Sequence, residues 1–566
     1  MLTFLLSLLS FCSVTLGSGP DQVCLQNALN STLGGTVDLY GNPTTNISQI
    51  AGITYDRCVA ACGYGPVDFN WPGFSAQFTS WLLPWLALIS QLPHGSGDAL
   101  SSCLAVLLTV GSPTLAAYSL ALAVISNRWM VKRFELITYP NSNLAAQTLG
   151  ELQQVSLIFP EEEHVLPSLI VLPANEIWWR RLAHGLDYMI PTWTLASVAS
   201  VLFVVLADIF NWVGMFFSGP TGGGGPLSSL WLCFLPILIG YLQLSPKSQS
   251  GRIRRAFNHA NSSFHVTTDE GKLKPGHGSL LIKVQTACRD PIDEDEISSA
   301  PIFFYARALS WLRMVRKVAD GFDAASQRAS DYHTDGIPPS KRQQVIDYCK
   351  SEDQIDENTP EFFNIFLTSA FLAILLQWGT TGIAMVPMYL APPKGLCHLI
   401  IIVEFRSLKY LGFGCRAGAY LLYTCVSTLI WLLCVVSSIL SHSYKTSQKR
   451  TTTSAIVRGL SIAFRRMAKV LATVNAIGLF VTAIYQYSNL SNDCWCISGK
   501  LSLRQKAYVV VIFSNNSMGI WILGFVMSFL AAGLFLLAIN LLRRRPERPY
   551  QASDGWEELQ TLNTCQ

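Results

Sequence analysis

Eight long apolar segments dominate this chain of 566 residues and restrict it to one kind of architecture. Most of them reach about 18 residues, the length at which an apolar helix can cross a bilayer. Backbone groups in lipid must hydrogen-bond within their own segment, so the segments are expected to be helices. The sequence therefore predicts an all-α, polytopic transmembrane helix bundle with about seven to eight spanning segments. The apolar segments are residues 75–92, 101–125, 191–215, 226–245, 364–390, 417–440, 469–488 and 517–542.

The low charge content supports a protein surface that faces lipid. Charged residues make up 13% of the chain, against about 25% in soluble globular proteins. A soluble protein with so few charges would have difficulty covering its surface. The lipid bilayer is therefore the expected partner, and the formal net charge of only +4 argues against nucleic acid.

Residues 1–17 have the features of a signal peptide. The apolar stretch is followed by small residues near Gly17–Gly19, and it is short for a spanning helix. Because no basic residue follows Met1, a retained anchor is the alternative.

Residues 18–74 are predicted to form a small lumenal or extracellular region. They are polar and contain three cysteines and two N-glycosylation sequons, which together favour an oxidising compartment. One disulfide is expected here, with its pairing left open. The disulfide candidates are Cys24, Cys58 and Cys62, and the glycosylation candidates are Asn30 and Asn46. This places the protein in a membrane of the secretory pathway, either the plasma membrane or an endomembrane.

A second lumenal stretch is expected at residues 489–516. It carries a sequon at Asn489 and the pair Cys494 and Cys496. This pair is one residue short of the CxxC spacing, so the two cysteines are expected to form disulfides and not to perform redox chemistry.

Basic residues indicate which loops face the cytosol. Residues 126–190, 246–363, 441–469 and 543–566 together hold 32 of the 40 Lys and Arg residues. Because cytosolic loops are enriched in these residues, we expect these stretches and the C-terminal tail to be cytosolic. Stretch 126–190 lies within the first membrane unit, 75–245, and residues 364–542 form the second.

The number of crossings in the first membrane unit does not fit this charge pattern. A lumenal region 18–74 and a cytosolic loop 126–190 require an odd number of crossings, but two apolar segments lie between them. Pro84 interrupts the first segment, and Gly111–Pro113 interrupts the second. We expect seven full crossings and one re-entrant or tilted segment. The alternative is eight crossings with 126–190 in the lumen.

Residues 246–363 are predicted to form a cytosolic domain of mixed structure. Leu280–Val284 is expected to be a strand, and the acidic cluster Asp293–Glu296 a solvated loop. A basic run at the start of the domain is typical of a segment beside the inner leaflet. This run consists of Arg252, Arg254 and Arg255.

Residues 300–325 are predicted to form an amphipathic helix. Its apolar stripe, Ile302, Tyr305, Leu309, Leu312 and Val315, is separated from the basic residues Arg307, Arg313, Arg316 and Lys317. Such a helix either lies in the membrane interface or docks on the bundle.

Several sequence stretches carry a resemblance to known proteins. They are Gln77–Pro93, Leu108–Leu120, Ala300–Phe303, Gln377–Gly382 and Gly414–Gly418. They resemble an uncharacterised family of fungal multi-pass membrane proteins with no established function. The resemblance covers most of residues 55–545 and implies a shared architecture, but nothing about activity.

Residues 394–410 depart from the pattern of that family. They are additional residues between two of the matching stretches, and they represent either a lumenal insertion or a wrongly joined gene model. We expect them to be poorly ordered.

A few polar side chains inside apolar segments are the candidates for a functional site. Asp208 could bind a cation or relay a proton, or it could simply reach the interface or bond Asn211. The others could line a polar pathway or merely bond across helix contacts. They are Gln377, Thr380, Thr381 and Asn475. The break at Gly111–Pro113 is either a discontinuous helix of the kind found in transporters or a simple kink.

The sequence contains no motif for catalysis, a cofactor or a metal. We therefore expect a non-enzymatic protein without a cofactor. Transport or sensing of a small solute, whose identity the sequence leaves open, is the leading hypothesis. The alternative is a membrane scaffold or a receptor-like signalling protein that engages a cytosolic partner through residues 246–363.

We predict that Asn46→Gln removes one N-linked glycan, because a sequon is modified only in the lumen. Digestion with an endoglycosidase, followed by gel electrophoresis, measures the change. A protein whose mobility is the same with and without the substitution would contradict a glycosylated, lumenal Asn46.

Overall fold

The computed structural model is mostly helical, and its strands are only two or three residues long. Individual residues aside, it describes the chain in segments separated by short gaps. The described segments are 34–63, 71–92, 99–158, 162–188, 192–218, 231–244, 249–285, 290–331, 341–350, 360–382, 415–446, 452–488, 493–499, 501–512 and 518–543. The predicted insertion at 394–410 and the predicted signal peptide at 1–17 lie outside them.

Within the described residues, three helices are long and apolar enough to cross a membrane. They are α18 (Pro360–Gln377), which continues into the π-helix η7 (Trp378–Gly382), α20 (Cys415–Thr446) and α21 (Thr452–Tyr487). The number rises to four if α6 (Ala99–Gly111) and α7 (Pro113–Glu135), which are bent by 103° at a short break, count as one span. The expectation of a helical membrane protein is therefore confirmed in this coarse form.

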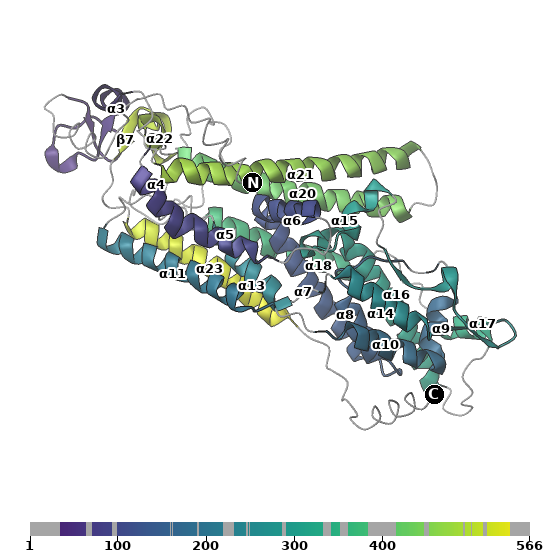
Figure 1. The fold of residues 1–566 in the computed structure, drawn as a ribbon. Helices are drawn as coiled ribbons and strands as arrows, with labels where there is room; N and C mark the ends of the chain where they lie inside the picture. The colour runs from purple at the N-terminus through teal and green to yellow at the C-terminus, as the bar shows by residue number, and fades with distance from the viewer. Residues whose placement is uncertain are drawn as a thin grey trace.

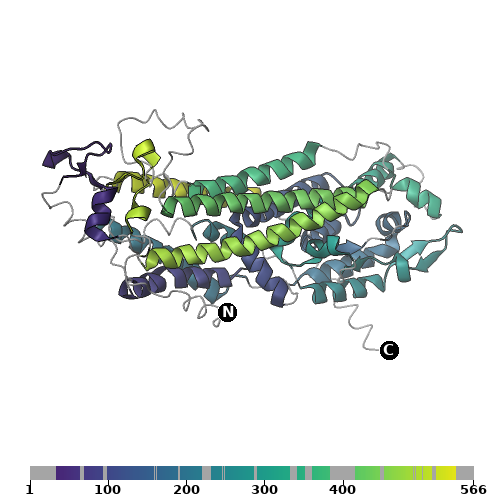
Figure 2. The same ribbon diagram turned by 90° about the horizontal axis from the view of Figure 1, so that it is seen from above.

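Further apolar helices lie alongside these three in a long bundle (Figures 1 and 2). Many large apolar side chains across the bundle are exposed, such as Leu202 of α11 (Leu195–Ser218), Val474 of α21 and Leu537 of α23 (Met518–Leu542). Apolar surface of this kind marks contact with a membrane. These helices are α4 (Trp71–Gln77), the π-helix η2 (Phe78–Leu82), α5 (Leu83–Ser90), α11 (Leu195–Ser218), α13 (Phe234–Leu244) and α23 (Met518–Leu542).

Helices α6 (Ala99–Gly111) and α7 (Pro113–Glu135) form a sharply bent pair inside the bundle. Helix α6 packs closely on α21 at Gly111. The two backbones are so near that a Cβ atom on this residue would lie 2.1 Å from the Ala472 carbonyl oxygen. Pro113 has no amide hydrogen and begins the next helix. The 103° bend shows a true break, where the sequence alone allowed a simple kink.

One end of the bundle carries a small domain with disulfides, which we call the disulfide domain (residues 34–63 and 493–512; Figure 1). Its strands β1 (Thr36–Val37), β2 (Gly52–Thr54) and β7 (Val510–Ile512) form an antiparallel sheet in the order β1-β2-β7. Segments more than 400 residues apart in sequence are thus paired here. The domain also contains η1 (Ile47–Gln49), α3 (Tyr55–Cys62), α22 (Cys494–Ile497) and η10 (Leu501–Lys506).

The opposite end carries a larger domain, the loop domain (residues 136–188, 249–285 and 290–350, except 332–340; Figure 1). Two stretches that the sequence presents separately, 126–190 and 246–363, fold together here. Strand β3 (Leu157–Ile158) pairs with β6 (Lys283–Val284), and α10 (Glu176–Leu186) packs on α14 (Ser250–Asn261). The first stretch supplies α8 (Ser142–Glu151), β3 (Leu157–Ile158), α9 (Val165–Val171), η3 (Pro173–Asn175) and α10 (Glu176–Leu186).

The second stretch supplies the rest of the loop domain. Its elements are α14 (Ser250–Asn261), β4 (His265–Thr267), β5 (Leu273–Pro275), η4 (Gly278–Leu280), β6 (Lys283–Val284), η5 (Pro291–Asp293), α15 (Glu294–Ile297), η6 (Pro301–Phe303), α16 (Phe304–Asp331) and α17 (Arg342–Tyr348). The strand expected at Leu280–Val284 is thus reduced to its last two residues.

Helix α16 corresponds to the predicted amphipathic helix, and it docks on the rest of the protein. Tyr305, Leu312 and Val315 of the apolar stripe are buried, whereas Leu309 is partly exposed. The prediction that Arg307 lies away from the buried face is wrong, because its side chain is only 2% exposed. The polar partners described below compensate this buried charge.

The basic stretch 441–469 is another difference from the expectation. It is mostly helical, because α20 extends to Thr446 and α21 already begins at Thr452. The basic residues of α21 therefore stand on a rigid helix that projects beyond the apolar segment 469–488. A loop would not hold their side chains at fixed positions.

Candidate functional site

The polar residues predicted inside α18 and η7 lie at a contact with α20. Gln377 Nε2 donates a hydrogen bond of 3.0 Å to Thr381 Oγ1, which lies 2.9 Å from Thr424 Oγ1 of α20. Thr380 Oγ1 donates to the Leu376 carbonyl oxygen at 2.7 Å. All four side chains are at least 99% buried. They join two helices through polar contacts, and Gln377 Oε1 is left without a hydrogen-bond partner among the described residues.

Asn475 of α21 compensates the break between α6 and α7. Its Nδ2 donates to the Gly111 carbonyl oxygen at 2.7 Å and to the Tyr423 carbonyl oxygen at 3.2 Å. The Tyr423 hydroxyl in turn donates to the Val110 carbonyl oxygen at 2.7 Å. The end of a helix leaves carbonyl groups without partners, and here α20 and α21 supply partners for two of them.

Ser112 serves the other side of the break. Its Oγ accepts a bond from the Leu115 amide at 3.3 Å, which caps α7, and donates to the Ser427 carbonyl oxygen at 2.7 Å. Thr114 Oγ1 lies 3.0 Å from Ser427 Oγ. Side chains thus occupy the backbone groups that a discontinuous helix would offer to an ion or substrate.

Asp208 lies on α11, but its side chain is outside the described part of the structure. The four other predicted polar residues form two groups, one around Gln377 and one around Asn475. No hydrogen bond among the described residues connects the two groups directly. Both have the character of helix contacts.

A second polar cluster, which the sequence did not predict, lies where the bundle meets the loop domain. Asp295 is 1% exposed, and its carboxylate lies 2.8 Å from Lys469 Nζ and 3.4 Å from Arg465 Nε. The Tyr305 hydroxyl donates to Asp295 Oδ2 at 2.5 Å. A buried carboxylate is stable only with such partners, because burial removes its hydration. We call these four residues the Asp295 cluster.

The remaining acidic residues of Asp293–Glu296 extend this contact. Lys445 of α20 pairs with Asp293 at 2.6 Å and also with Glu296. Lys469 reaches Glu294 at 2.7 Å. The prediction that this acidic run is a solvated loop is therefore wrong. Basic residues on α20 and α21 attract the run and hold it against the bundle.

Two neighbouring residues strengthen the same junction. Arg458 of α21 pairs with Asp290 at 2.8 Å, and its hydrogen bond holds the pKa of that carboxyl below the ordinary value. Buried Arg307 donates to Gln154 Oε1 at 2.7 Å and to the Ser298 carbonyl oxygen. Burial lowers the pKa of Arg307 to about 10, so the guanidinium stays charged at neutral pH.

The predicted disulfide cysteines are connected across the disulfide domain. Cys58 is bonded to Cys494, and Cys496 to Cys415, at Cα separations of 6.0 and 4.8 Å. Cys62 is also disulfide-bonded, and Cys24 lies outside the described residues. Cys415 was not predicted, because the stretch around it, Gly414–Gly418, contains neither a second cysteine nor a sequon that would indicate a disulfide.

The predicted glycosylation sites are only partly described. Asn46 is exposed beside η1, in agreement with an accessible sequon. Asn30 and Asn489 lie outside the described residues.

The Asp295 cluster could not be found from the sequence. The acidic run and the basic residues of α21 were both visible, but they are more than 160 residues apart. Opposite charge alone does not select which of many basic residues an acidic run meets. Within the described segments, no group of three His, Cys, Asp or Glu residues is arranged to hold a metal ion.

Comparisons with known proteins add no assignment. No protein-family model, no curated protein and no solved structure matches the chain. The functional argument therefore depends on the geometry of the chain itself.

We predict that Asn475→Leu destabilises the bundle by about 1–3 kcal/mol, because buried carbonyl groups lose their partner. Thermal unfolding of the purified full chain measures the effect. Thr482→Val on the same helix is the control, since among the described residues the Thr482 hydroxyl bonds only to Gly478 of its own helix. Equal unfolding temperatures for the two variants would show that the break does not depend on Asn475.

Proposed function

We propose that the protein is a receptor-like signalling protein of a secretory-pathway membrane, which couples its disulfide domain to its loop domain. One observation carries this proposal. Helix α20 is bonded to the disulfide domain through Cys415–Cys496, and at its other end Lys445 is paired with the acidic run of the loop domain. Helix α21 packs along α20 and holds Asp295. Two rigid helices thus join the two domains.

The proposed topology has seven crossings and one re-entrant hairpin. Both ends of the α6–α7 pair lie toward the loop domain: Ser101 lies 3.4 Å from Ser298, and Arg133 pairs with Asp320. The bend reaches Ser427 and Asn475, inside α20 and α21. In this proposed arrangement the pair returns to the side from which it entered, so it adds no crossing. The number of crossings between the disulfide domain and residues 126–190 is then odd, as the loop charges require.

Contacts between helix ends support the same topology. Gln91, after α5, accepts a bond from Ser197 near the start of α11 at 3.1 Å. Thr192, before α11, donates to Leu242 near the end of α13 at 2.7 Å. These three helices therefore alternate in direction. The crossings are α4–α5, α11, α13, α18–η7, α20, α21 and α23.

The orientation follows from the two ends of the bundle. Disulfides form in the lumen, so the disulfide domain is assigned there. The basic helix ends and the loop domain are assigned to the cytosol. The sequence resemblance to fungal multi-pass proteins is compatible with this arrangement and is retained here as a proposal.

Signalling is favoured over transport because the predicted polar residues whose side chains are described, around Gln377 and Asn475, are packed in helix contacts. We also propose that the protein is not an enzyme, because its buried charged side chains are paired with one another between the loop domain and the bundle. A cytosolic partner would bind the surface of the loop domain. Helix α16 itself is unsuited to this role because its apolar face is buried.

Hydrogen exchange in the full chain, reconstituted in nanodiscs, tests the coupling. In the double variant Cys415→Ser/Cys496→Ser, amides of residues 290–297 should exchange about fivefold faster or more, the lower range of allosteric coupling. Cys425→Ser is the matched control, because Cys425 is a free thiol on the same helix. Unchanged exchange at 290–297 in the double variant would rule out this coupling.

Transport or sensing of a solute remains the second candidate, favoured by the break in α6–α7 and by unpartnered Gln377 Oε1. The packed contact predicts that a Thr381→Cys variant is not labelled by a membrane-impermeant maleimide applied to either side of the membrane. Both variants are made in a chain whose exposed thiols Cys103 and Cys425 are replaced by Ser, and Glu270→Cys in the loop domain, where the side chain is exposed, is the positive control. Labelling of Cys at position 381 would instead indicate a water-filled path and favour transport.

A further inference from the structure

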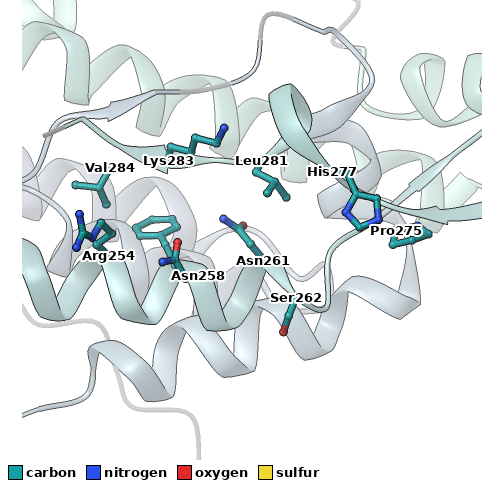
Figure 3. A pocket seen from close by; sticks show the side chains of 11 residues that line it. Arg254, Asn258, Asn261, Ser262, Pro275, His277, Leu281, Lys283 and Val284 are labelled. Carbon is teal, nitrogen blue, oxygen red and sulfur yellow. The ribbon is translucent and has the colours of Figure 1, made fainter. Parts of the chain in front are cut away.

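A pocket opens on the loop domain between α14 and the segment that contains β5 and β6 (Figure 3). Its volume of about 440 Å³ lies in the range of small-molecule sites. Apolar side chains, including Phe257, Leu281 and Val284, form one part of its lining. Polar and basic side chains form the rest, and none of the lining residues is acidic. These are Arg254, Asn258, Asn261, Ser262, His277 and Lys283.

The walls of this pocket are held in place by contacts that do not involve a ligand. Asn261 accepts a hydrogen bond from Trp178 Nε1 at 3.2 Å and donates to the Ile282 carbonyl oxygen at 2.9 Å. Phe257 is buried and packs its ring against Trp178. Helix α14 is thus fixed to α10 on one side and to the residue before β6 on the other. A ligand would meet a preformed site, which lowers the entropic cost of binding.

Among the residues that the structure describes, the two cations of the pocket have no counter-ion. Arg254 projects from α14 and Lys283 from β6, and both side chains are exposed. Neither has an ion-pair or hydrogen-bond partner in the part of the chain that the structure describes. This differs from the Asp295 cluster, where the buried cations are paired with carboxylates. Two unpaired cations at one pocket create a positive potential that favours an anion.

We propose that this pocket binds a small phosphorylated ligand, such as an inositol or sugar phosphate. Arg254 and Lys283 hold the phosphate groups, since a guanidinium donates two parallel bonds to phosphate oxygens and an ammonium adds a point charge. Asn258 and His277 are placed to bond hydroxyl groups, and the apolar lining contacts the carbon skeleton. Such a ligand is either a free metabolite or the headgroup of an inner-leaflet lipid.

This binding site does not depend on the proposed coupling between the two domains. Only its placement in the cytosol depends on the proposed topology. A failure of the hydrogen-exchange test would therefore leave the pocket unaffected, and the reverse also holds.

The test uses the full chain in nanodiscs of phosphatidylcholine, titrated with inositol 1,4,5-trisphosphate by microscale thermophoresis. Saturable binding is expected. Arg254→Glu and Lys283→Glu should each weaken it about tenfold or more, because each removes a charge-assisted contact and adds repulsion. Because both side chains are exposed, thermal unfolding of these variants should be unchanged.

Two matched controls make the same change in charge outside the pocket. Arg255→Glu is on α14 next to Arg254, and Lys274→Glu is on β5; neither residue lines the pocket. Their affinities should change less than about threefold, as expected for exposed charges screened by salt. An equal loss in the pocket and control variants would show a non-specific basic surface and overturn the site.

The source of the phosphate is resolved by a second arm with nanodiscs that contain phosphatidylinositol 4,5-bisphosphate. If the lipid headgroup occupies the pocket, soluble trisphosphate should bind these nanodiscs more weakly than those of phosphatidylcholine. If the ligand is a free metabolite, its affinity should be the same in both. The absence of saturable trisphosphate binding in phosphatidylcholine nanodiscs would refute the proposal.

Discussion

A helix that breaks inside an apolar bundle exposes backbone groups that hydrocarbon cannot hydrogen-bond, and the rest of this structure depends on how that constraint is met. Asn475 and Tyr423 bond the carbonyl groups at the end of α6, and Ser112 caps the start of α7 while bonding α20. Because these partners come from α20 and α21, the bent pair is fixed between them. Residues before and after the pair consequently lie at one end of the bundle, where the loop domain forms.

The Asp295 cluster fixes the loop domain to this end of the bundle. A buried carboxylate with two cations adds little net stability, because desolvation offsets much of the attraction. Its effect is to select one arrangement, since a shift of α21 along the acidic run would leave charges buried without partners. The disulfides Cys58–Cys494 and Cys415–Cys496 fix the opposite end covalently. Helices α20 and α21 are thus restrained at both ends, which is the physical basis for the proposed coupling.

Each terminal domain is assembled from distant parts of the chain. The disulfide domain combines β1 and β2 with β7, and the loop domain combines stretches on both sides of α11 and α13. The membrane helices bring these parts together, so neither domain is encoded by one continuous segment. The basic pocket beside α14 belongs to this composite loop domain, because Trp178 of α10 holds Asn261 in place.

Three features could be predicted from the sequence by itself: the lipid surroundings of the apolar segments, the helical class of the structure, and the place where α6 and α7 are separated. Long apolar segments require helices in lipid, and Pro113 cannot continue the α6 hydrogen-bond pattern. The apolar stripe of residues 300–325 likewise predicted a helix, but not that Arg307 would be buried within its contact. Tertiary structure alone decided the partners: Cys415 for Cys496, α21 for Asp295, and Asn475 for Gly111. The periodicity and charge of a segment indicate which of its side chains must be buried or neutralised. Which residue each of them contacts depends on how the helices pack, and the local sequence does not encode this.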